Sequence, residues 1–110
     1  TIGEVDVYDF KTGKWSTLAN PLPTLRAGTT SVVKKPYLIV MNGESTKQVS
    51  AHSEVEALDT RTGNWLRLPD LLQGRHGTSA VYLKHKIYVM AGSANRGGGP
   101  ELNTMECLDW

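Results

Sequence analysis

The chain has 110 residues, enough for one small domain. Hydrophobic residues make up 39% and charged residues 21%, which is an ordinary composition for a folded globular chain and not for a disordered one. The 12 Lys and Arg residues oppose 11 Asp and Glu, so the net charge of +1 provides no electrostatic basis for binding nucleic acid or an anionic membrane surface.

Targeting and redox signals are sparse. No apolar run approaches the ~20 residues of a membrane-spanning helix. The opening residues, Thr1 to Glu4, have neither the basic end nor the apolar block of a secretory signal, although a leader removed earlier would leave such a start. Cys107 is the only cysteine, so no disulfide forms within the chain. These features leave the compartment unknown.

The residue pattern predicts only short β-strands separated by turn residues, and no segment carries a helical apolar stripe. The segments are rich in Val, Ile, Thr and aromatic residues, and the two at 37–41 and 87–91 are continuously apolar, which favours burial of both faces. In chain order the strands are expected at residues 5–9, 15–18, 29–33, 37–41, 55–59, 65–68, 78–83, 87–91 and 105–109.

These elements repeat with a period of about 50 residues. The segment 5–9 returns at 55–59 and again at 105–109, and the Thr-Gly-x-Trp turn that ends at Trp15 returns at Trp65. The Arg-x-Gly element of Arg26 returns at Arg75. Four antiparallel strands in each period are typical of the blades of a β-propeller.

The order of these features resembles the kelch repeat, and the loop Asn95-Arg96-Gly97-Gly98-Gly99-Pro100-Glu101 resembles those of bacterial kelch-repeat proteins. An Arg-x-Gly element is followed by an apolar strand ending in Gly, then by a Val/Glu strand ending in Asp, then by Thr-Gly-x-Trp. The chain departs from the usual double glycine after the second strand, where it has Asn42-Gly43 and Ala91-Gly92. The resemblance implies an all-β fold of kelch-type propeller blades.

The repeat divides the chain into one complete blade and two partial blades. Residues 1–25 supply strands three and four of one blade, residues 26–69 a whole blade, and residues 70–110 strands one to three of the next. Repeat units of this kind do not bury their apolar faces alone. We therefore expect further blades in the same chain, or self-association, to cover the open blade faces.

Several residues that resemble catalytic or metal-binding groups are explained by their place in the repeat. The same position on successive third strands carries Asp6, Glu56 and Glu106. Their carboxylates are therefore expected to lie too far apart to act as the paired acids of a glycosidase. Cys107 falls on a face expected to be apolar, where a free cysteine acts as a small hydrophobe. No Ser/His/Asp signature and no metal-ligand spacing is visible, so we expect no catalytic residue, no metal and no cofactor.

The candidate ligand-binding residues follow from propeller geometry and from the resemblance. Residues just before the first strand lie at the mouth of the central channel, beside the long polar loops 44–53 and 93–103. In kelch proteins that grip peptides or proteins, these elements resemble the contact set. The candidates are Arg26, Arg75, His76, Glu44, Ser45, Asn95 and Arg96. The alternative is that the repeated arginines only bond neighbouring carbonyl groups and tie blades together.

Three functions remain open at this point. The first is a binding module for a protein, peptide or glycan at the channel mouth, which rests on fold-level analogy. The second is part of a carbohydrate-active enzyme, because kelch-like sialic acid epimerases share the fold. The third is a structural assembly unit whose blade faces are its interface. The resemblance slightly favours a periplasmic or extracellular location.

Overall fold

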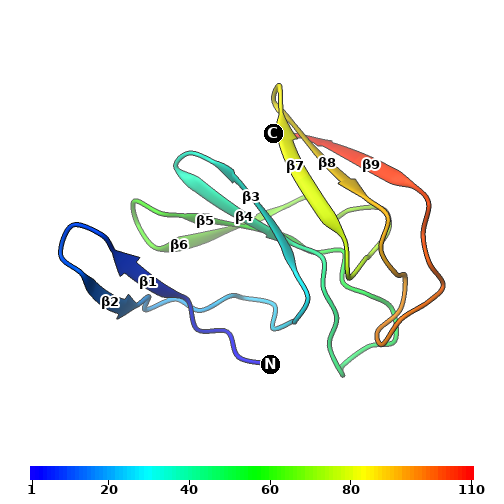
Figure 1. The fold of residues 1–110 in the computed structure, drawn as a ribbon, viewed down its shortest axis with the longest axis horizontal. Coiled ribbons are helices and arrows are strands. Elements are labelled where there is room, and N and C mark those ends of the chain that lie inside the picture. The colour runs from blue at the N-terminus through cyan, green and yellow to red at the C-terminus, as the bar shows by residue number, and fades with distance from the viewer.

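The computed structural model describes all 110 residues and shows an all-β chain of three antiparallel sheets (Figure 1). Blade 1 contains β1 (Asp6–Asp9) and β2 (Lys14–Thr17). Blade 2 contains β3 (Thr30–Lys34), β4 (Tyr37–Met41), β5 (Val55–Asp59) and β6 (Asn64–Leu68), hydrogen-bonded in that order. Blade 3 contains β7 (Ser79–Leu83), β8 (Lys86–Met90) and β9 (Met105–Asp109).

The expected architecture of one four-stranded blade flanked by two partial ones is confirmed, and the strand ends differ from expectation by about one residue. The second strand of blade 3 was expected to include Ala91, but β8 ends at Met90. Ala91 has a φ of 59°, which takes the backbone out of the extended region and opens the long loop that follows.

Turn residues define the strand connections as the sequence indicates. The amide of Gly63 donates to the carbonyl of Asp59, and the Asp59 carboxylate accepts the amide of Arg61 at 2.9 Å. Blade 1 repeats this turn at Asp9 and Gly13. In both copies the glycine has a positive φ, which a residue with a Cβ adopts only at a cost.

The hydrophobic core lies between blades 2 and 3. β4 contributes Ile39 and Met41, β5 contributes Val55 and Ala57, and all four are fully buried. Ile87 of β8 faces them and is equally buried. The inner strands β3 and β7 lie side by side, so the two sheets fan out from a common inner edge (Figure 1).

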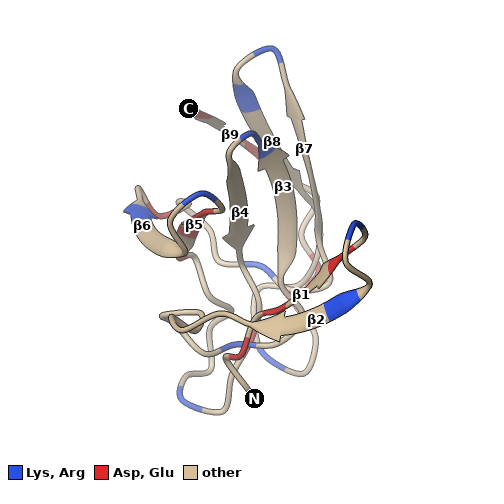
Figure 2. Ribbon diagram, turned by 90° about the vertical axis from the view of Figure 1, so that its left-hand side faces the viewer, with Lys and Arg blue, Asp and Glu red and all other residues tan.

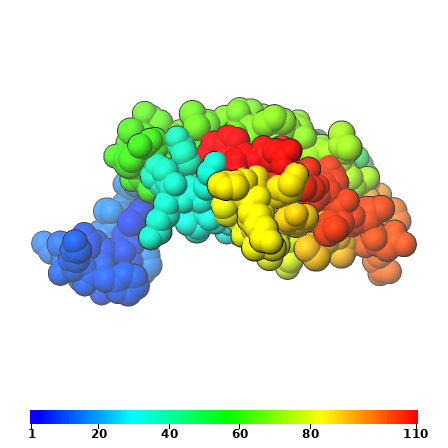
Figure 3. Space-filling model, turned by 90° about the horizontal axis from the view of Figure 1, so that it is seen from above, coloured from blue at the N-terminus to red at the C-terminus, as the bar shows by residue number.

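Equivalent positions of the repeat differ in burial because only blade 2 has a neighbour on each side. Ala57 is fully buried, Val7 is 39% exposed, and Cys107 is exposed. The expectation that Cys107 is packed against an apolar face is therefore wrong for this chain: no further sheet covers that face of blade 3. Figure 3 shows blade 1 as a lobe at one end of an arc formed by the other two blades.

Two long loops gather at the edge of the fan opposite the hairpin turns (Figure 1). Loop A (residues 42–54) joins β4 to β5, and loop B (residues 91–104) joins β8 to β9. Lys and Arg residues are distributed among the turns and loops and interspersed with Asp and Glu (Figure 2). Charge therefore does not single out one blade, and the loops are the most distinctive surface.

Candidate functional site

Arg26 lies beneath loop A and is 4% exposed. Its Nε donates to the carbonyl of Asn42 at 2.7 Å, and its Nη1 forms a 2.8 Å ion pair with the Glu56 carboxylate. Its Nη2 reaches the carbonyl of Glu54 at 3.5 Å. Because Asn42 and Glu54 are the two ends of loop A, Arg26 holds the neck of that loop closed.

Arg75 has the same role in blade 3 and is fully buried. Its Nη1 donates to the carbonyls of Ala91 and Thr104 at 3.0 and 2.9 Å, the two ends of loop B. The Glu106 carboxylate is 3.6 Å from its Nη2 and also accepts the amide of Gln73. Both arginines therefore make the contacts of the alternative interpretation of the sequence, in which the repeated arginines bond neighbouring carbonyl groups.

Loops A and B contact each other although they belong to different blades. The amide of Ala51 donates to the carbonyl of Ala94 at 2.8 Å, and the amide of Arg96 donates to the carbonyl of Val49 at 2.8 Å. The guanidinium of Arg96 donates to the carbonyl of Thr46 at 2.9 Å. The two backbone bonds form an isolated antiparallel β-bridge between Ser50 and Asn95, which fixes the two loops relative to each other.

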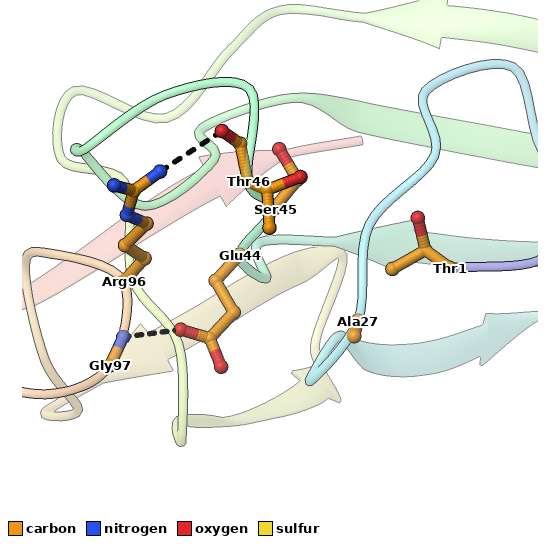
Figure 4. A pocket seen from close by; sticks show the side chains of 7 residues that line it. All are labelled: Thr1, Ala27, Glu44, Ser45, Thr46, Arg96 and Gly97. Carbon is orange, nitrogen blue, oxygen red and sulfur yellow. Dashed lines mark hydrogen bonds between the residues drawn. The ribbon is translucent and has the colours of Figure 1, made fainter.

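A pocket of about 440 Å³, here called the loop pocket, opens where the loops meet. On one side the Glu44 carboxylate accepts the amide of Gly97 at 2.6 Å, and Arg96 extends from loop B toward Thr46 (Figure 4). The pocket is lined by Thr1, Ala27, Glu44, Ser45, Thr46, Arg96 and Gly97. It therefore combines one carboxylate, one guanidinium and several hydroxyl and backbone groups.

His76 and Asn95 border this region through their own contact. The His76 Nε2 lies 2.7 Å from the carbonyl of Asn95, so that nitrogen carries the proton and donates. The same nitrogen is 3.7 Å from the Glu44 carboxylate. His76 thus links the start of blade 3 to both loops.

Of the candidates named from the sequence, the structure brings Glu44, Ser45 and Arg96 into one pocket with His76 and Asn95 beside it. Arg26 and Arg75 are absent from the lining and are enclosed at the loop necks. The third-strand acids do not converge: Asp6 accepts the hydroxyl of Thr17, whereas Glu56 and Glu106 bond the segments that precede β3 and β7.

A hydrogen-bonded chain of three side chains in loop A escaped the sequence analysis. The Ser45 Oγ is 2.8 Å from the His52 Nε2, and the His52 Nδ1 is 2.9 Å from the Glu54 carboxylate. Burial raises the pKa of Glu54, but a backbone hydrogen bond and the His52 partner outweigh it and the net pKa is lowered. A Ser…His-x-Glu spacing within one loop is the only sequence signal, and it is too common to be diagnostic.

No group of three or more His, Cys, Asp and Glu side chains is arranged to hold a metal ion. The chain also forms no helix that is long and apolar enough to cross a membrane.

The fold and its repeat define the class of protein: these are blades of a β-propeller. A family model described as Kelch motif matches residues 74–109, which span loop B and all three strands of blade 3. The chain belongs to the kelch-repeat family. Kelch repeats generally mediate contacts between proteins.

Several curated proteins are similar to this chain. The Kelch repeat protein C2 of Cowpox virus is 34% identical over 89 residues, covering 80% of this chain and 17% of its own length. Kelch repeat and BTB domain-containing protein 8 of Rattus norvegicus is 30% identical over 112 residues, covering 96% and 20%. Kelch-like protein terF of Aspergillus terreus is 25% identical over 87 residues, covering 77% and 19%.

The chain therefore spans only a fifth or less of the length of these relatives. They come from a virus, a mammal and a fungus, so they add nothing to the resemblance to bacterial kelch proteins.

Proposed function

We propose that this chain is a protein-binding module and that the loop pocket, with its rim of Asn95 and Arg96, takes an acidic, extended segment of the partner. The observation that carries the proposal is the contact between loops A and B, which holds Glu44 and Arg96 in fixed positions on one surface. A preorganised surface binds with a smaller loss of conformational entropy than a pair of independent loops.

Arg96 is the recognition group in this proposal. It is exposed, and only one of its five guanidinium N–H donors, on Nη1, is occupied by Thr46. The remaining donors have the fork geometry that matches a carboxylate in a bidentate pair. An Asp or Glu side chain of a partner is therefore the preferred ligand group, and the Glu44 carboxylate disfavours a second acid beside it.

Arg26 and Arg75 support the binding surface from beneath in this proposal. Their donors are directed at the carbonyls that end each loop, and their side chains are buried. We assign them the role of positioning residues: they fix where loops A and B leave the sheets, and the partner contacts the exposed rim.

The test is the charge reversal Arg96→Glu. Binding is measured by fluorescence anisotropy against a panel of extended peptides that differ in Asp and Glu content. Acidic peptides are expected to bind the unmodified protein and to bind Arg96→Glu about 10- to 100-fold more weakly, because a hydrogen bond to a charged group contributes about 1.5–3 kcal/mol.

The matched control is Lys11→Glu, which makes the same charge change on the exposed turn of blade 1. Its peptide affinity should remain within about twofold at 0.15 M salt, because exposed charges beyond ~8 Å are screened. Equal weakening by both variants would reveal a general charge effect and overturn the pocket assignment. A panel of neutral and acidic glycans run in parallel decides between protein and glycan as the ligand.

A further inference from the structure

The side-chain chain in loop A has the hydrogen-bond pattern of an activated nucleophile. Ser45 is 9% exposed and His52 is 4% exposed, so both side chains are largely shielded from water. The Ser45 Oγ and the Glu54 carboxylate contact opposite ring nitrogens of His52, at 2.8 and 2.9 Å. Serine, imidazole and carboxylate thus stand in the order that defines a nucleophile, a base and an orienting acid.

The hydrogen bonds determine which nitrogen of His52 carries the proton when the ring is neutral. The Glu54 carboxylate only accepts hydrogen bonds, so the His52 Nδ1 carries the proton and donates to it. The Nε2 is then an acceptor and faces the hydroxyl of Ser45. This is the tautomer in which imidazole takes a proton from a serine hydroxyl.

Loop closure does not require these side chains. Loop A closes through the amide of His52, which donates to the carbonyl of Gly43, and loop B closes in the same way through Leu102 and Gly92. In loop B the places of Ser45, His52 and Glu54 are taken by Ala94, Leu102 and Thr104. The fold is therefore satisfied by side chains that form no such chain, and the arrangement in loop A calls for a separate explanation.

Ser45 lies where a ligand reaches it, because it lines the loop pocket together with Thr46 and Arg96 (Figure 4). The backbone amides of Ser45 and Thr46 donate to no group of the chain. Unpaired amides beside a nucleophile are the type of donor that stabilises the oxyanion of an acyl-transfer reaction.

We propose that the loop pocket is a serine-hydrolase-type site for small carboxylic esters, with Ser45 as nucleophile, His52 as general base and acid, and Glu54 as the positioning residue of His52. Arg96 on the same pocket favours esters that also carry an acidic group. This inference goes beyond partner binding and does not depend on it.

The chemistry uses only the ester and water. The Ser45 Oγ forms a bond to the carbonyl carbon and passes its proton to the His52 Nε2. The bond from that carbon to the alcohol oxygen then breaks, and His52 returns the proton to the leaving alcohol. Water repeats the sequence on the acyl-serine, releasing the carboxylic acid and restoring the Ser45 hydroxyl.

Covalent labelling tests this assignment directly. A fluorophosphonate probe reacts with an activated serine by forming an Oγ–P bond and expelling fluoride, and peptide mass spectrometry identifies the labelled residue. We expect label on Ser45, no label in Ser45→Ala, and labelling slowed at least about 100-fold in His52→Gln, because a general base contributes about 10²–10⁴ in rate. Ser50→Ala, an exposed serine of the same loop, should label like the unmodified protein.

A second measurement separates the positioning role of Glu54 from a structural one. The time course of fluorophosphonate labelling gives both a rate constant and the fraction of the protein that is finally labelled. In Glu54→Gln the rate constant should fall while the final fraction stays the same, because His52 has lost the carboxylate that fixes its orientation and tautomer. A loss of folding alone would lower the final fraction and leave the rate constant of the folded molecules unchanged.

Folding is controlled with the double variant Ser45→Ala/His52→Leu, which installs the residues of loop B. It should keep the circular dichroism spectrum and the urea-unfolding midpoint of the unmodified protein within error while losing label and esterase activity. The proposal is overturned if native protein labels no faster than urea-denatured protein, if the label resides elsewhere, or if His52→Gln labels at the original rate. None of these outcomes affects the Arg96 peptide test.

Discussion

Buried polar side chains at the loop necks determine the shape of the candidate surface. Arg26 and Arg75 each bond both ends of a long loop, so the loop leaves and re-enters the sheet at a fixed separation. Next to the first neck, His52 donates to Glu54 within loop A. At the scale of the residue, the site therefore depends on a few hydrogen bonds that are protected from water.

The Glu54 carboxylate should make stability depend on pH in the acid range. Its pKa in the folded chain is below its ordinary value of 4.5, so it stabilises the fold above about pH 4.5 and loses that contribution as the pH falls through the folded-state pKa. Urea denaturation at pH 6 and pH 3 should show a smaller loss of unfolding free energy for Glu54→Gln than for the unmodified chain. Identical losses would contradict this assignment.

At the scale of the element, the third strands of the three blades show how one sequence position takes different roles. β5 is buried along most of its length, whereas β1 is exposed throughout and β9 alternates. The second residue of the segments 5–9 and 55–59 is acidic in both blades. Glu56 is buried in an ion pair, whereas Asp6 is exposed and accepts the hydroxyl of Thr17. Equivalent positions of the repeat therefore keep the same type of residue, but the contribution of that residue to the stability of the fold differs between blades.

This difference predicts unequal costs for equivalent substitutions. Glu56→Gln leaves the buried guanidinium of Arg26 without its counter-charge, and removing one partner of a buried pair costs about 3–5 kcal/mol. Asp6→Asn, at the same place in blade 1, should cost less than about 1 kcal/mol because the carboxylate is exposed. Urea unfolding of the two variants measures the difference, and similar costs would disprove the role of the buried pair.

At the scale of the whole molecule, the stacking of blades decides which apolar side chains are covered. Trp65 is half-buried, and its Nε1 donates to the carbonyl of Asn20 in the preceding blade at 3.1 Å. Its counterpart Trp15 is 70% exposed and packs against Tyr8 of its own blade. Residues 1–25, 26–69 and 70–110 remain our proposed blade boundaries, with further blades or a second copy of the chain covering the open faces.

A matched pair of substitutions measures this coverage. In the 110-residue chain, Trp65→Ser should lower the free energy of unfolding by about 2–3 kcal/mol, because it removes half-buried ring area and an inter-blade hydrogen bond. Trp15→Ser should cost less than about 1 kcal/mol. If both cost the same in this chain, Trp15 is covered by self-association, which sedimentation at two concentrations would detect.

Much of the fold was predictable because its signals are local. Alternating or continuous apolar runs set the strands, and Asp and Gly at fixed offsets set the turns, as at Asp59 and Gly63. The 50-residue spacing then groups four strands into one blade. The strands and turns depend on neighbours within a few residues, and the spacing is visible as matching segments along the chain, so one sequence without homologues was enough to predict them.

The candidate site was predictable only in part because its contacts join separate loops. The sequence pattern predicted that Glu44, Ser45 and Arg96 lie on one rim. It also predicted that Arg26 and Arg75 belong to the same surface, but both are buried. Their burial follows from the carbonyls that sheet formation brings together around each guanidinium. The Ser45–His52–Glu54 chain depends on how loop A folds back on itself, and a loop has no periodicity from which to read that path.

The sequence by itself determined the repeat, the strand order and the turns of this protein, because those depend on side-chain pattern and backbone preference along a short stretch of chain. Only the tertiary structure decided which copy of each repeated residue is buried, which arginines close the loop necks, and which loop residues meet in the pocket. The burial of the repeated residues and the meeting of the two loops depend on the neighbouring blade, and blade 2 alone has one on each side. The loop necks instead depend on sheet formation within each blade, which brings the carbonyls at the two ends of a loop to one arginine.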